Sequence, residues 1–259
     1  MKKSVLMIIV CAVLIAALVI GLNRCDIMGG SSKGDKDSKK ESKLPPKATV
    51  CIDAGHGFAD VGCESPYLEG YEKDVTIKIA KFLKKELESR NIKVILTHDG
   101  KKFPTCKEIL KGVDKYDLEY DSARIIENNN FSAYERVIYA NVVNETQPID
   151  LLVSLHVNSI ENHPELSQYE LYYYENNPHA EELKTLCKNL ENAFDNDTKT
   201  TATLADESYT VTRYTDYPSL LIEMGYATNR EDAKKVNQEK WRKEYAKTLA
   251  EQIENFVDK

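Results

Sequence analysis

Two histidines of this 259-residue chain follow apolar, strand-like runs. His56 comes after residues 50–54, and His156 comes at the end of residues 151–155. A third apolar run, residues 219–222, leads into Glu223, and Glu72 opens a helical pattern. Two His and one Glu are a known ligand set for catalytic zinc, which leaves the fourth position for water. The remaining Glu could accept the proton of that water.

Each of these residues also has an interpretation without a metal. His56 could be a buried histidine in a glycine-rich turn or part of a phosphate-binding loop, although residues 58–60 lack the further glycines that such a loop would need. Glu72 could be a carboxylate that only favours the helix dipole. Glu223 would be a costly buried charge if it had no partner, so a metal site explains it better than packing does.

The elements that must position these residues alternate between strand and helix patterns. We expect strands at 50–53, 93–97, 151–154, 170–174 and 220–223, and helices from Glu72 onward and at 133–143, 179–194 and 238–256. In the first helix, Val75, Ile79, Leu83 and Leu87 recur at helical spacing. This order predicts a single α/β domain with a twisted, mostly parallel or mixed sheet flanked by helices on both faces.

In order and spacing, the chain resembles the zinc-dependent N-acetylmuramoyl-L-alanine amidases of bacterial cell walls, whose catalytic domain opens with a DxGHG motif. The resemblance runs from about residue 49 to about residue 256. It rests on residues 52–57 (IDAGHG), 71–75 (YEKDV), 135–136 (ER), 140–141 (AN), 154–158 (SLHVN) and 218–229 (PSLLIEMGYATN).

The resemblance implies roles for individual residues. His56, Glu72 and His156 would bind one Zn²⁺ per chain, and Glu223 would be the catalytic carboxylate. Three more residues match family positions and would either hold hydrogen bonds around the site or substrate, or cap structure: Asn158, Arg136 and Asn141.

Two departures from the family pattern concern the shape of the cleft. His98 stands where relatives commonly have an arginine, and residues 168–170 (QYE) stand where a glycine is common. Because His98, His163 and His179 lie among polar residues, we expect them to be solvent-exposed histidines rather than ligands.

The amino-terminal segment predicts a membrane attachment. Lys2 and Lys3 precede an uncharged stretch, residues 4–22, that is long enough to cross a bilayer as a helix. It is longer than the roughly 7 to 15 residues of a signal-peptide core, and no small residues precede Cys25 as in a lipoprotein. We expect an anchor or signal segment at 1–27, a flexible linker at 28–47 and the catalytic domain at 48–259. The protein would be extracytoplasmic and membrane-anchored, or secreted if the segment is cleaved.

The charge of the expected catalytic domain bears on its partners. Residues 48–259 hold 26 Lys and Arg against 38 Asp and Glu, a net charge of −12. This argues against a nucleic-acid partner and against strong adhesion to anionic wall polymers.

Cys63 and Cys106 could form a disulfide outside the cytoplasm. Residues 100–131 form an insertion that is either a surface loop, or a lid or docking element for a regulatory protein partner.

These observations predict an enzyme that acts on peptidoglycan. The expected reaction is hydrolysis of the amide between N-acetylmuramic acid and L-alanine, during cell-wall remodelling in cell separation or spore-cortex maturation. One alternative is a zinc peptidase of related fold, which would release only shortened peptides. Another is a non-catalytic wall-binding scaffold, which would tolerate the loss of Glu223.

Overall fold

The computed structural model of the chain describes residues 44–102, 109, 132–194, 200–205 and 209–258, with the side chains of residues 200–205 excepted. The expected anchor or signal segment, most of the expected linker, most of the insertion at 100–131 and Cys106 lie outside these residues. Cys63, the other half of the expected disulfide, is a free cysteine. In the part of the chain that is described, no helix combines the length and the apolar character needed to cross a bilayer.

A mixed six-stranded sheet is the centre of the domain. Its order is β2-β1-β3-β6-β4-β5. The first four strands in this order run parallel to one another, whereas β4 pairs with β6 in the antiparallel direction and with β5 in the parallel direction. The strands are β1 (Thr49–Ala54), β2 (Lys93–Leu96), β3 (Leu151–Asn158), β4 (Tyr169–Tyr173), β5 (Thr200–Ala205) and β6 (Ser219–Tyr226). The expected mixed sheet is confirmed, and β5 is an addition to it.

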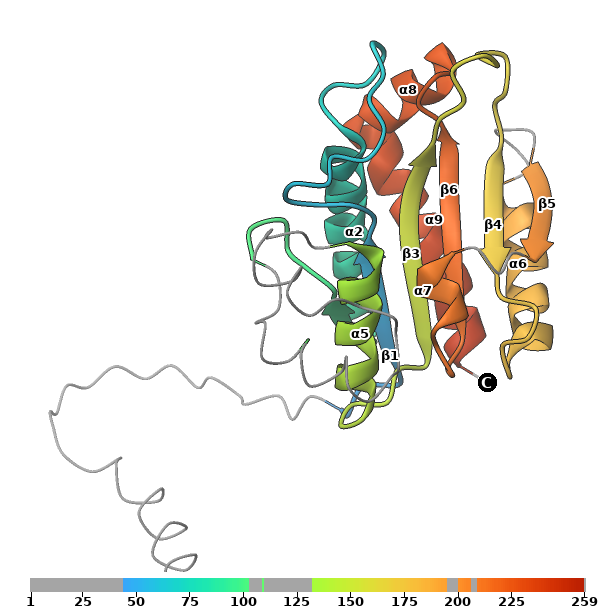
Figure 1. The fold of residues 1–259 in the computed structure, drawn as a ribbon. Coiled ribbons are helices and arrows are strands. Elements are labelled where there is room, and N and C mark those ends of the chain that lie inside the picture. Colours follow the sequence, from blue (N-terminus) through green and yellow to red (C-terminus); the bar gives the residue numbers. More distant parts are fainter. Residues whose placement is uncertain (1–43, 103–108, 110–131, 195–199, 206–208, 259) are drawn as a thin grey trace, which may run out of the picture. The chain divides into compact units, whose positions relative to one another are not determined.

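Helices cover both faces of this sheet, as expected (Figure 1). The apolar residues of α2 (Glu72–Ser89), α6 (Ala180–Phe194), α8 (Arg230–Asn237) and α9 (Glu239–Val257) share one core with the sheet. On the other face lie α5 (Ala133–Asn144) and α7 (Thr210–Arg213), which pack in two smaller clusters. The four predicted helices are confirmed, and α7 and α8 are additional short helices.

The alternation of side chains along the strands separates the core from the polar residues. Leu151, Val153, Leu155 and Val157 of β3 all belong to the large core. The intervening residues of β3, which include His156, therefore face the side of α5 and α7. Since neighbouring strands are in register, Asp53, Glu223 and Glu170 face the same side. One face of the sheet thus packs in the large apolar core. The other face carries polar side chains toward the carboxyl ends of the parallel strands.

A buried ion pair attaches α5 to this polar face. Arg136 Nε donates to Asp53 Oδ1 at 2.7 Å, and both side chains are buried. Thr97 and Ser154 donate to the two oxygens of the same carboxylate, each at 2.7 Å. Burial alone would raise the pKa of Asp53, but Arg136 and the two hydroxyls lower it to about 2. Because losing one partner of a buried pair costs about 3 to 5 kcal/mol, this network fixes α5 and three strands together.

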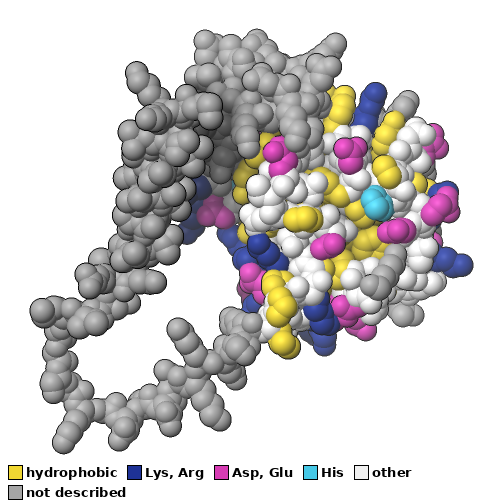
Figure 2. Space-filling model, turned by 90° about the horizontal axis from the view of Figure 1, so that it is seen from below, with side chains coloured by type: hydrophobic (Ala, Val, Ile, Leu, Met, Phe, Trp, Pro, Cys, Tyr) yellow, Lys and Arg dark blue, Asp and Glu magenta, His cyan; other side chains and the backbone are white. Residues whose placement is uncertain are grey.

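The amino ends of β1, β3 and β6 lie at the end of the sheet opposite to these polar residues. Figure 2 shows this end, where acidic, basic and hydrophobic side chains of the described residues are interspersed. The polar residues named above gather instead toward the carboxyl ends of β1, β3 and β6. That edge is where α/β folds place their ligand sites.

Candidate metal centre

Three side chains from three elements meet at the carboxyl edge of the sheet. His56 follows β1, Glu72 is the first residue of α2, and His156 lies near the end of β3. One nitrogen or oxygen atom from each lies within 4.8 Å of the others. The two imidazole rings are 4.8 Å apart, centroid to centroid, and nearly perpendicular. The structure therefore brings together all three residues expected to be metal ligands.

Glu72 lies between the two histidines. Its Oε2 is 3.2 Å from His56 Nε2, and its Oε1 is 3.1 Å from His156 Nδ1. The backbone N–H groups of Cys63 and Val157 donate to the same two oxygens at 2.8 and 2.9 Å. Glu72 is only 3% exposed, and burial alone would raise its pKa. The hydrogen bonds from His156 and His56 outweigh burial and hold the pKa of Glu72 well below its usual range.

The turn that presents His56 depends on glycine. His56 itself has a positive φ of 64°. A side chain at Gly55 would place its Cβ 2.4 Å from the ring of His156, so only glycine leaves room for this ring beside the turn. Gly57 pairs with Asp60 across the turn, and Asp60 Oδ1 lies 2.9 Å from His56 Nδ1.

Asp60 orients His56 through the nitrogen that faces away from Glu72. Burial would lower the pKa of His56, but Asp60 and Glu72 raise it from 6.5 to about 9. A carboxylate on the second nitrogen of a metal-binding histidine fixes the orientation of its ring. Asp60 is a site residue that the sequence analysis misses, because the DxGHG motif ends before it. The signal that could have found it is a carboxylate four residues after His56, in the same turn.

Glu223 lies opposite His156 on the neighbouring strand, and one of its carboxylate oxygens has no hydrogen bond to any described residue. It is the cross-strand partner of His156 on β3 and of Glu170 on β4. Glu223 is 7% exposed, and its Oε2 has no hydrogen-bond partner among the described residues. Burial, followed by the charges of Glu72 and Glu170, raises the pKa of Glu223 well above its usual value. A carboxyl group with a raised pKa is suited to exchange protons near neutral pH.

The three residues with less specific expected roles lie in different places. Arg136 pairs with Asp53 below the site. Asn141 donates to the backbone oxygen of Tyr214 and accepts from the hydroxyl of Tyr217, so it connects α5 to the segment that leads into β6. Asn158, two residues after His156, donates to Glu170 Oε2 at 2.6 Å. Of the three, Asn158 lies at the edge of the sheet where Glu223 and His156 stand.

The expectation that His98 is exposed is wrong. His98 is 4% exposed, its Nε2 donates to the backbone oxygen of Ala54 at 2.8 Å, and its Nδ1 accepts from the N–H of Gly100. Burial lowers the pKa of His98. The local sequence is polar, but the residue follows β2 and therefore packs against the end of β1. His163 is exposed and His179 is partly exposed, as expected.

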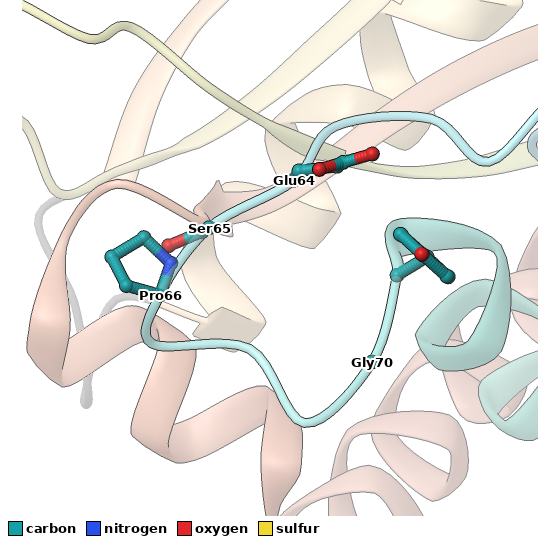
Figure 3. A pocket seen from close by; sticks show the side chains of 5 residues that line it. Glu64, Ser65, Pro66 and Gly70 are labelled. Carbon is teal, nitrogen blue, oxygen red and sulfur yellow. The ribbon is translucent and has the colours of Figure 1, made fainter.

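A loop beside Glu72 surrounds an open cavity of about 550 Å³ (Figure 3). Glu64, Ser65 and Pro66 lie on one limb of the loop, and Gly70 lies on the returning limb. The Ser65 hydroxyl donates to the backbone oxygen of Ala227, which follows β6. This loop therefore connects the start of α2, where Glu72 lies, with the end of β6.

Comparisons with known proteins show which family the sequence matches. The sequence profile of the N-acetylmuramoyl-L-alanine amidase family matches residues 50–255. YqiI of Bacillus subtilis (strain 168) is 25% identical over 211 residues, which are 81% of this chain and 85% of that protein.

Solved structures are similar over the same part of the chain. The N-acetylmuramoyl-L-alanine amidase AmiC2 of Nostoc punctiforme is 28% identical with a TM-score of 0.62, over 83% of this chain and 100% of that one. The CwlD amidase of Clostridioides difficile, solved in complex with the GerS lipoprotein, has the same fold with a TM-score of 0.60 at 21% identity, over 81% of this chain and 98% of that one.

The contact between Asp60 and His56 predicts a change in proton affinity. In metal-free protein, Asp60→Asn should lower the pKa of His56 from about 9, because burial then acts against a weaker opposing charge. A titration of the His56 ring by NMR measures this. Asp216→Asn, which removes an exposed carboxylate before β6, serves as the control and should leave the His56 titration unchanged. Equal titration curves for His56 in the Asp60→Asn variant and the parent would contradict the assigned contact.

Proposed function

The chain belongs to the N-acetylmuramoyl-L-alanine amidase family, and we propose that it uses one bound Zn²⁺ to hydrolyse the amide between the lactyl group of N-acetylmuramic acid and the first L-alanine of the peptidoglycan stem peptide. The observation that supports this best is the position of Glu72 between His56 and His156, with the unsatisfied Glu223 beside them. The proposal assigns metal binding to the first three residues and proton transfer to the fourth.

The donor atoms suit zinc. Two imidazole nitrogens and one carboxylate oxygen are a set found in catalytic zinc sites. They come from a turn, a strand and a helix start that are held by other contacts, so the site is largely formed by the fold. A bound Zn²⁺ would polarise the amide carbonyl and lower the pKa of water at the site. Because the pKa of His56 is raised to about 9, metal binding would release a proton from this ring, since ligands bind in their deprotonated forms.

Glu223 has the proton-transfer role in this proposal. Its free Oε2 accepts a proton from the attacking water while the water oxygen bonds to the carbonyl carbon. The carbon–nitrogen bond then breaks, and Glu223 gives the proton to the nitrogen of L-alanine. Its raised pKa supports the second step, since a carboxyl group of ordinary pKa holds a proton too weakly to deliver it near neutral pH.

The family assignment favours this reaction over the two alternatives. A zinc peptidase of related fold would use the same ligands but would cut between amino acids of the stem. A wall-binding scaffold would not require a buried carboxyl oxygen without a hydrogen bond, such as Oε2 of Glu223, which costs about 1 to 3 kcal/mol and more if charged.

Substitution of Glu223 tests the proposal. Glu223→Gln in the full-length protein should lower the turnover of purified peptidoglycan by about a hundredfold or more, since an amide cannot accept the proton. Mass spectrometry of peptidoglycan digested by the parental protein should show intact sugar chains with free lactyl carboxylates and stem peptides with a free amino-terminal L-alanine.

The control is Glu165→Gln, which changes an exposed glutamate and should keep the parental rate. Parental turnover in Glu223→Gln would remove its role as the proton carrier. Products cut only within the stem would establish a peptidase instead.

For the location of the enzyme, we propose that residues 4–22 hold the domain at the outer face of the membrane and that residues 28–47 act as a tether. Deletion of residues 4–22 should move the protein from the membrane fraction to the soluble fraction with its activity retained, because the catalytic residues all lie beyond residue 48. Fractionation followed by an activity assay measures this. Retention at the membrane would contradict the anchor and point to a protein partner, as the CwlD–GerS complex illustrates for a relative of the same fold.

A further inference from the structure

Glu170 lies beside Glu223 in a very different environment. It is 6% exposed and faces Glu223 directly across the antiparallel pair of β4 and β6. Four neutral groups donate to its two oxygens: Asn158 at 2.6 Å, Tyr226 at 2.7 Å, Gln168 at 2.8 Å and Tyr172 at 2.9 Å. A carboxylate that accepts four hydrogen bonds is satisfied in its ionised form, whereas a neutral carboxylic acid or an amide at this place would oppose a donor to a donor.

Two of these donors mark an irregularity in the sheet. His156 pairs with Glu223, and the next regular pair is Asn158 with Tyr226. Between the two pairs, β3 advances by two residues and β6 by three, so β6 contains a bulge. Gly225 allows the bulge with a φ of 104°.

The bulge changes the face on which Tyr226 lies. In a regular strand, Tyr226 would face the opposite side from Glu223, because three residues is an odd number. The extra residue brings the Tyr226 ring to the side of Glu223, where its hydroxyl reaches Glu170. From the other side, Asp232 of α8 accepts from the backbone N–H of Tyr226 at 3.0 Å. The bulge is thus held by one carboxylate on each face of the sheet.

We propose that Glu170 is a positioning residue of the metal centre: it ties the ends of β3 and β6 to β4 beyond the bulge and thereby sets the place of His156 and Glu223 relative to each other. His156 and Glu223 are the last pair before the bulge, and Glu170 binds both members of the first pair after it. Each carboxylate oxygen of Glu170 accepts two hydrogen bonds, so neither is free for substrate or metal. This inference rests on the proposed function for its effect on turnover but not for its effect on the metal site.

Two tyrosines on Glu170 provide a matched test. Tyr226→Phe and Tyr172→Phe each remove one hydroxyl that donates to Glu170 and keep the ring. Of the two tyrosines, only Tyr226 connects two strands, because it lies on β6 whereas Tyr172 lies on β4 with Glu170. We expect Tyr226→Phe to lower kcat on peptidoglycan about threefold or more with KM little changed, and Glu170→Gln to lower kcat about tenfold or more. Tyr172→Phe should match the parent.

The visible absorption spectrum of the Co²⁺-substituted full-length protein gives a second measurement that does not depend on turnover. The bands of Glu170→Gln and Tyr226→Phe should shift, since they report the arrangement of the ligands, and those of Tyr172→Phe should not. Equal effects of the two tyrosine substitutions would overturn the proposal even if Glu170→Gln fails to fold. So would a folded Glu170→Gln protein with the parental spectrum and kcat. A parental protein without amidase activity would reject the proposed function and leave the spectra to decide the role of Glu170.

Discussion

The carboxylate of Glu72 between two imidazoles is the interaction on which the site depends. The three elements that carry the expected metal ligands meet at this carboxylate: the turn after β1 through His56, β3 through His156 and the start of α2 through Glu72 itself. Burying the charge is unfavourable, and the two histidines and two backbone N–H groups offset that cost. A metal at this place would replace the histidine contacts by stronger ones, with the backbone contacts still holding the carboxylate.

Buried carboxyl groups divide the polar face of the sheet into two kinds of position. Asp53 and Glu170 are saturated with donors and connect strands to one another or to α5. Glu223, which lies in the same row as His156 and Glu170, is buried with a free oxygen. Native proteins retain such a group where chemistry requires it, because packing alone would favour its removal. The saturated groups provide the rigidity that lets one unsatisfied group stay in place.

The sequence predicts the strands and helices whose residues repeat regularly, and it also predicts the convergence of His56, Glu72, His156 and Glu223. Each of these four stands at the end of an apolar run or the start of a helix, and parallel strands bring such ends together. The helices α7 and α8 have too few residues for a clear period. The strand β5 (TTATLA) holds three threonines and so lacks the apolar run that marks most of the predicted strands. The burial of His98 and the contacts of Glu170 with β3 and β6 could not be predicted, because they depend on neighbouring strands rather than on nearby sequence.

The zinc content of the purified full-length protein tests the central claim most directly, since the proposed reaction requires a metal held by Glu72 and the two histidines. Elemental analysis should find one zinc per chain in the parent and almost none in the His56→Ala, His156→Ala double variant. Circular dichroism should show that the double variant keeps the fold. A full complement of zinc in the folded double variant would contradict the assignment of the metal centre.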